Sequence, residues 1–167
     1  KLAEGTEFAL NLSNGGRVTA VTESTFVLED ATGGIYVDAP DNGFTAGDLI
    51  IGTIQGIYSE QMGSYISSAD ISGLTVIMNL PYEPTEVTLE DAFDSYVQQL
   101  VKLTNLTVHL NDDELSVEDK DGTEVPINTI LGLAEEVTSL KDGDTIEEMT
   151  GYATILSENS ILVTWMG

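Results

Sequence analysis

The sequence contains no cysteine and very little positive charge. Its 167 residues include one histidine and 5 Lys and Arg against 29 Asp and Glu, which gives a formal net charge of −24. The lack of cysteine excludes disulfides, thiolate metal sites and a cysteine nucleophile. The lack of positive charge disfavours nucleic acid and anionic membrane surfaces, because a field of this sign repels both.

Long apolar runs are also missing. No run approaches the ~20 residues of a membrane-spanning helix, so we expect no transmembrane segment. No signal peptide is visible, and a start at Lys1 is typical of a trimmed mature form or a fragment, so a lipid anchor outside the given chain is compatible with it. Hydrophobic content of 41% is enough for a packed core.

What the sequence does contain is one phrase that occurs twice. The first copy is Val27–Val37 and the second is Leu115–Val125; in each, an apolar run ends in Glu-Asp and a glycine soon opens a new extended segment. Gly-Asp follows each copy, at 47–48 and at 143–144. A period of about 90 residues is too long for a solenoid repeat and indicates two copies of one small β-domain.

The boundary between the copies is predicted from proline content. Residues 79–86 contain Pro81 and Pro84 and are typical of a short stiff linker. We therefore expect domains at 1–80 and 81–167. Residues 1–80 carry 10 acids and 2 bases, a charge of −8, and residues 81–167 carry 19 acids and 3 bases, a charge of −16.

The predicted elements are mostly strands. In the first copy they lie at 5–22 (interrupted by a bulge at 14–16), 26–28, 35–37, 49–58 and 65–66, with an extended run at 74–78. In the second copy a helix capped by Thr88 runs to about Tyr96, and strands follow at 99–110, 115–117, 125–127, 146–156 and 161–165, with a helix at 129–138. The first copy has only a loop, 40–47, where that second helix lies. This order predicts an all-β fold of two tandem OB-fold-like five-stranded Greek-key barrels, the second with a helix between strands three and four.

The family resemblance rests on several short segments. They are Thr25–Gly34, Ala46–Asp48 and Gly52–Gly56 in the first copy, and Leu89–Ala92 with Gln99–Leu103 in the second. These resemble the OB-fold domains of uncharacterised exported and surface lipoproteins of gut Bacteroidetes. The second copy departs from the pattern at Asp119–Gly122, where Lys and Asp replace Ala and Thr. The resemblance implies a bacterial protein outside the cytoplasm, in the periplasm or at the cell surface, and it carries no catalytic signature.

Catalytic chemistry has little support in the sequence. Any Ser-His-Asp relay must use His109, the single histidine, and this residue falls at a strand end among polar residues. No Gly-x-Ser-x-Gly elbow is present. We therefore expect an exposed histidine and a protein that is not an enzyme.

Acidic residues offer a second kind of site. Asp119, Asp121 and Glu124 lie in and after the predicted turn of the second copy, and carboxylate oxygens are the ligands that calcium prefers. The alternative is a solvated hairpin tip. Calcium at these three residues is thus a candidate cofactor, and no other cofactor is predicted.

Aromatic residues are the remaining candidates. Tyr36, Tyr58 and Tyr65 fall on successive strands of the first barrel, and Phe44 lies in the loop that follows the third strand. OB-folds bind ligands on the face of strands two and three and in adjoining loops. We expect a shallow ligand site bounded by these four rings; the alternative is that the rings pack in the core or between domains.

Three functions stay open at this point. The first is a non-catalytic binding or adhesion module outside the cytoplasm, with a glycan or protein partner. The second is a single-stranded nucleic-acid binder, which rests on fold analogy and which the charge makes unfavourable. The third is an accessory domain of a larger hydrolase.

Overall fold

The computed structural model divides the chain into two compact units. It describes residues 2–60, 63–112, 114–129, 134–155 and 159–166. Unit 1 is Lys1–Glu83 and unit 2 is Pro84–Gly167. Each unit holds a separate hydrophobic core.

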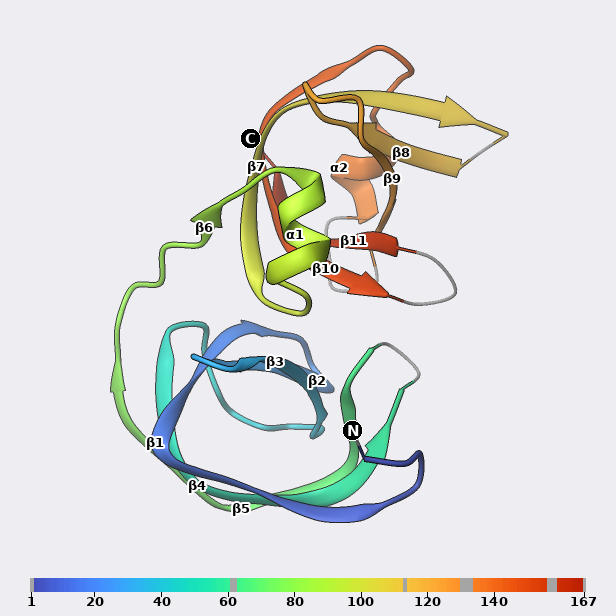
Figure 1. The fold of residues 1–167 in the computed structure, drawn as a ribbon. Coiled ribbons are helices and arrows are strands. Elements are labelled where there is room, and N and C mark those ends of the chain that lie inside the picture. The colour runs from blue at the N-terminus through green and yellow to red at the C-terminus, as the bar shows by residue number, and fades with distance from the viewer. Residues whose placement is uncertain (1, 61–62, 113, 130–133, 156–158, 167) are drawn as a thin grey trace. The chain divides into compact units, whose positions relative to one another are not determined.

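Unit 1 is a closed five-stranded barrel (Figure 1). Its strands are β1 (Glu7–Val21), β2 (Thr25–Asp30), β3 (Gly33–Asp38), β4 (Asp48–Ser59) and β5 (Tyr65–Asn79). They follow each other around the barrel in the order β1-β2-β3-β5-β4, and β4 pairs back with β1. The β3–β5 pairing is parallel and the other pairings are antiparallel. This order confirms the predicted OB-fold-like barrel.

Glycines let the long strands of unit 1 bend. β1 continues through Asn14 to Gly16, but its register against β4 shifts between Leu12 and Gly16, as expected for a bulge. In β4, Gly52 has φ of +122°, and a Cβ there would lie 2.0 Å from the carbonyl oxygen of Gly73 on β5. Only glycine fits that approach. The run at 74–78 is the second half of β5 rather than a separate element.

The 40–47 segment of unit 1 is a loop, as predicted. The Asn79 side-chain amide at the end of β5 donates to Oγ1 of Thr45, to the Ala46 carbonyl and to Oδ1 of Asp48. These bonds tie the end of the barrel to the loop.

Unit 2 is a second closed five-stranded barrel with short additions. Its barrel strands are β7 (Leu100–Asn111), β8 (Glu114–Glu118), β9 (Glu124–Asn128), β10 (Thr145–Ile155) and β11 (Asn159–Met166). The order is β7-β8-β9-β11-β10, closed by the β10–β7 pairing, and the two-residue β6 (Thr85–Glu86) lies parallel to β7 outside the ring. The two barrels share one strand order, which fits the duplicated phrase.

Helix α1 (Leu89–Ser95) precedes the first strand of unit 2. Thr88 is its N-cap, and its hydroxyl oxygen accepts a hydrogen bond from the Asp91 amide at 3.1 Å. Leu89 and Ala92 are fully buried in the core of the barrel. The predicted cap and apolar face are confirmed.

Helix α2 (Ala134–Thr138) lies between β9 and β10, where the second helix was predicted. Residues 130–133 of the predicted range 129–138 lie outside the described residues. The core of unit 2 extends from α1 across β7, β8, β9, β10 and β11.

Candidate functional site

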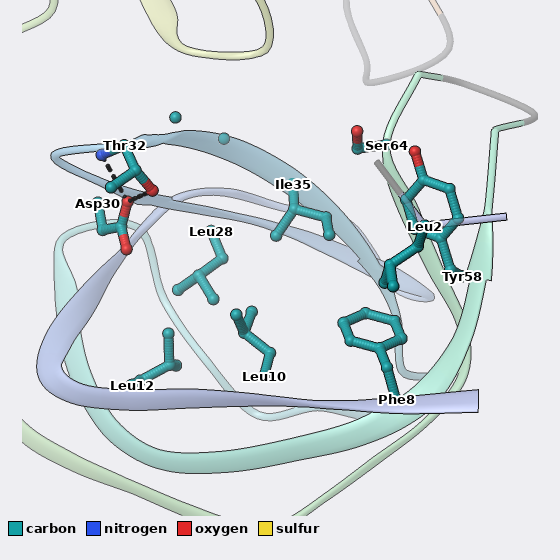
Figure 2. Close-up of a pocket in the computed structure, with 12 residues that line it drawn as sticks. Leu2, Phe8, Leu10, Leu12, Leu28, Asp30, Thr32, Ile35, Tyr58 and Ser64 are labelled. Carbon is teal, nitrogen blue, oxygen red and sulfur yellow. Dashed lines mark hydrogen bonds between the residues drawn. The ribbon is translucent and has the colours of Figure 1, made fainter. Parts of the chain in front are cut away.

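The first barrel contains an apolar cavity of about 250 Å³ (Figure 2). It exists because the first half of β1 pairs only with β4, whereas the β2–β3 hairpin pairs with β1 only from Arg17 onward. The hairpin and the first half of β1 therefore diverge, and inward side chains face each other across the gap. The lining comprises Leu2, Phe8, Leu10, Leu12, Leu28, Asp30, Thr32, Gly33, Gly34, Ile35, Tyr58 and Ser64.

The walls and the rim of this cavity differ in polarity. Leu12 and Leu28 are almost fully buried, and the rings of Phe8 and Tyr58 meet edge to face at 6.3 Å between centroids. Polar groups gather at the ends of the cavity: Figure 2 shows Asp30 and Thr32 at the hairpin turn, and Ser64 and Tyr58 belong to the other end. Such a hollow suits an apolar group, with few polar contacts to orient it.

The four aromatic residues of the predicted ligand site do not line one surface. Tyr36 is fully buried, so it offers no ring face to a ligand. Phe44 is half-buried and packs edge-on against Phe26, with 5.0 Å between the ring centroids. Tyr65 is half-buried beside Tyr36 in the parallel β3–β5 pairing.

Only Tyr58 of these four lines the cavity. It is 6% exposed, and its hydroxyl donates to Oε1 of Glu60 at 3.2 Å. Tyr58 thus meets an aliphatic hollow rather than the other three rings, and the Tyr36 side chain on β3 is fully buried. Ligand contact by Phe44, Tyr58 or Tyr65 stays a prediction. The aliphatic lining was missed, since inward leucines have the same sequence pattern whether or not a cavity separates them.

The three predicted calcium ligands have other partners in the structure. Asp119 accepts hydrogen bonds from three backbone amides: Oδ1 from Asp121 and Thr123, and Oδ2 from Leu89 at the start of α1. The Asp121 carboxylate pairs with Lys120, and the Glu124 carboxylate accepts from the Ser116 hydroxyl. Among the described residues no group of three or more His, Asp and Glu side chains is arranged to hold a metal ion. Calcium binding stays untested, but the turn is stabilised without it.

His109 lies on β7 with acidic neighbours. Its Nε2 is 2.7 Å from Oε2 of Glu118, and its Nδ1 is 3.9 Å from Oδ1 of Asp142. The hydrogen bond to Glu118 is the main cause that raises the pKa of His109, and the charges of Glu124, Glu118 and Asp142 add to it while desolvation opposes it. Ser116, opposite His109 in the β7–β8 register, donates to Glu124 instead. No nucleophile–base hydrogen bond joins Ser116 to His109.

The fold assignment rests on the strand order, because comparison with known proteins adds nothing to it. No protein-family model matches the chain, and a search of curated proteins found no match. Among solved structures, the chain aligns with a chain of a replication protein A heterotrimer bound to ssDNA, at 7% identity and a TM-score of 0.26. That alignment covers 98% of this chain and 49% of the other, so this chain spans about half its length. A likeness this low bears on neither the fold nor the ligand. Separately, no helix of the described residues is long and apolar enough to cross a membrane.

Proposed function

We propose that this chain is a non-catalytic binding module and that the apolar cavity of its first barrel is the ligand site. The observation that carries the proposal is the cavity: about 250 Å³, walled by aliphatic side chains and rimmed by a few polar ones. Ligand sites in proteins commonly have this form. Loops and hairpins on a rigid barrel are also where recognition usually takes place.

The chemistry of the cavity favours a protein partner over a glycan. Each sugar hydroxyl that leaves water needs a hydrogen-bond partner. The polar lining groups are few, namely Asp30, Thr32, Ser64 and the Tyr58 hydroxyl, and each of them already has a partner within the protein. An apolar side chain of a partner makes no such demand.

A non-catalytic role is consistent with the one histidine. His109 bonds to Glu118, and the serine opposite it donates to Glu124 rather than to His109, so the two do not form a nucleophile–base pair. The location outside the cytoplasm, in the periplasm or at the cell surface, is part of the proposal. It rests on the resemblance of Thr25–Gly34 and its companion segments to exported lipoproteins.

The test uses printed arrays of glycans and of peptides, probed with the labelled full-length chain. We expect binding to peptides with apolar side chains, lost in a Leu10→Trp variant, because the larger ring fills the cavity. Leu110→Trp is the matched control, since Leu110 is 43% exposed and lies on β7 of the other barrel. Binding that survives Leu10→Trp in a protein of unchanged melting temperature would exclude the cavity, and glycan binding alone would replace the protein partner.

A further inference from the structure

Helix α1 of the second barrel occupies the place that corresponds to the cavity of the first. The duplicated phrase aligns the β8–β9 turn with the β2–β3 turn, and so Asp119 with Asp30. In unit 2, α1 lies between β7 and the β8–β9 hairpin: Leu89 shares one surface hollow with Leu103 of β7 and another with Val125 of β9. In unit 1, the cavity lies between β1 and the β2–β3 hairpin.

The corresponding aspartates each accept a hydrogen bond from the backbone amide two residues later, and in the described part of the chain only the one in unit 2 also bonds to a helix. In unit 2, Oδ2 of Asp119 accepts from the Leu89 amide at 3.0 Å and so caps α1, while Oδ1 holds the turn. In unit 1, Oδ1 of Asp30 holds the turn through the amide and hydroxyl of Thr32, as Figure 2 shows. No helix precedes β1 among the described residues, and Leu2, which is 42% exposed, lies at the cavity instead.

The apolar walls correspond as well. Under α1, Val117 and Val125 of the hairpin are buried in one cluster with Leu89 and Ala92. In unit 1 the hairpin residues Leu28 and Ile35 face the cavity across from β1, and the described part of this unit has no helix over them. The second barrel thus shows that a short helix can fill such a gap.

We propose that the cavity of the first barrel is an acceptor site for a short amphipathic helix of a protein partner. The inference rests on the proposed function, because it names the occupant of that same cavity. The apolar face of the helix enters the gap as Leu89 and Ala92 do in unit 2. Helix-in-groove docking of this kind is a common mode of peptide recognition.

The acidic residues around the cavity determine which charge suits the outer face of the partner helix. The cavity lining includes Asp30, and none of its described residues is Lys or Arg. At the other end, Glu60 accepts from the Tyr58 hydroxyl, and the Glu60 amide donates to Oε2 of Glu4. Residues 1–83 carry 11 acids and 2 bases, a charge of −9. A helix with Lys or Arg on its solvent face therefore complements this site, whereas an acidic one is repelled.

The experiment measures binding of labelled peptides to the full-length chain by fluorescence anisotropy at low salt. The parent peptide spans residues 85–99. A basic-face version carries Glu90→Lys and Asp94→Lys, since both residues are exposed on α1, and a broken-face version adds Leu89→Asp and Ala92→Asp. We expect the basic-face peptide to bind at least about ten-fold more tightly than either of the others. Leu10→Trp should weaken it about ten-fold or more, and Leu110→Trp should leave it unchanged.

A neutral apolar dye, N-phenyl-1-naphthylamine, separates this inference from the proposed function. If the dye binds the wild-type chain and not Leu10→Trp, the cavity is an accessible apolar site whatever the peptides do. Two outcomes would overturn the helix proposal and leave the cavity as a ligand site. One is dye binding without binding of the basic-face peptide, and the other is peptide binding that Leu10→Trp does not weaken. Failure of both dye and peptide would overturn both proposals. Melting curves of the two Trp variants show whether each still folds.

Discussion

The hydroxyl of Tyr82 donates a hydrogen bond to Oε2 of Glu29, with 3.0 Å between the two oxygens. Glu29 is buried in the first barrel, and its other oxygen accepts from the Thr19 hydroxyl at 3.1 Å. Arg17 lies over the Tyr82 ring at 5.8 Å from its centroid and donates to the Leu80 carbonyl. The segment that leaves β5 is therefore fastened to the first barrel.

Tyr82→Phe should destabilise the protein by about 1–3 kcal/mol, because a buried carboxyl group loses a hydrogen-bond donor while the ring remains. Urea-induced unfolding measures the difference. Tyr96→Phe is the matched control, since Tyr96 is a half-buried tyrosine at the end of α1 and belongs to the other unit. An unfolding free energy for Tyr82→Phe equal to that of wild type would show that water replaces the hydroxyl at no cost.

This contact also bears on the boundary between the two units. Pro81 and Pro84 mark residues 79–86 as a linker, with domains expected at 1–80 and 81–167, and unit 1 ends at Glu83, within that linker. Composition identifies a stiff segment but not what it packs on. The partner of Tyr82 lies 53 residues earlier in the chain, and no local pattern reports such a contact.

Features with local causes were predicted better. The cap of α1 depends on Thr88 and on a residue three positions later, and the bulge of β1 on two adjacent glycines, so both could be predicted from short windows. The cavity depends on the absence, in the described part of unit 1, of a helix over Leu28 and Leu10, and the alternation of apolar residues cannot show this absence. The same alternation cannot show whether Tyr36 is buried or exposed.

Gly52→Ala should destabilise the first barrel severely, by more than about 3 kcal/mol. A Cβ at this position would lie 2.0 Å from the Gly73 carbonyl oxygen, and the backbone φ is +122°. Gly43→Ala is the matched control: its φ is also positive, at +71°, but nothing lies within 4 Å of the added Cβ. That control should cost only about 1–2 kcal/mol, the price of a left-handed backbone at a non-glycine residue. Equal losses of unfolding free energy for Gly52→Ala and Gly43→Ala, measured by chemical denaturation, would mean that β5 moves aside.

Asp119→Ala should cost about 1–3 kcal/mol, since the amides of Leu89, Asp121 and Thr123 lose their acceptor. Asp121→Ala is the control and should change stability by less than about 0.5 kcal/mol, because that carboxylate is exposed and pairs only with Lys120 among the described residues. Calcium should leave the melting temperature of wild type unchanged. A rise with calcium that Asp119→Ala abolishes would support the predicted metal site, because a ligand of the folded state stabilises it.

Protonation of His109 should make stability depend on pH in a defined direction. The pKa of His109 is raised above 6.5, chiefly by its hydrogen bond to Glu118, so folding favours the protonated ring. The stabilising contribution is complete below pH 6.5 and is lost as the pH rises through the higher folded-state pKa. The difference in melting temperature between wild type and His109→Gln should therefore shrink as the pH rises through that folded-state pKa. NMR titration of the single histidine checks the pKa itself, and a value below 6.5 would reverse the expected trend.

Single-stranded DNA should not bind, although the barrels have the strand order of folds that bind it. Affinity for a phosphate backbone comes largely from Lys and Arg that displace counterions, and the chain has 5 such residues against 29 acids. In the described part of the first barrel the base is Arg17, and it is already held by the Tyr82 ring and the Leu80 carbonyl. Anisotropy of labelled poly-dT at low salt is the most permissive measurement, because screening is then weakest. Binding with a micromolar Kd that weakens as salt is added would show that a local cluster of bases outweighs the overall charge, and the nucleic-acid alternative would then replace the protein partner.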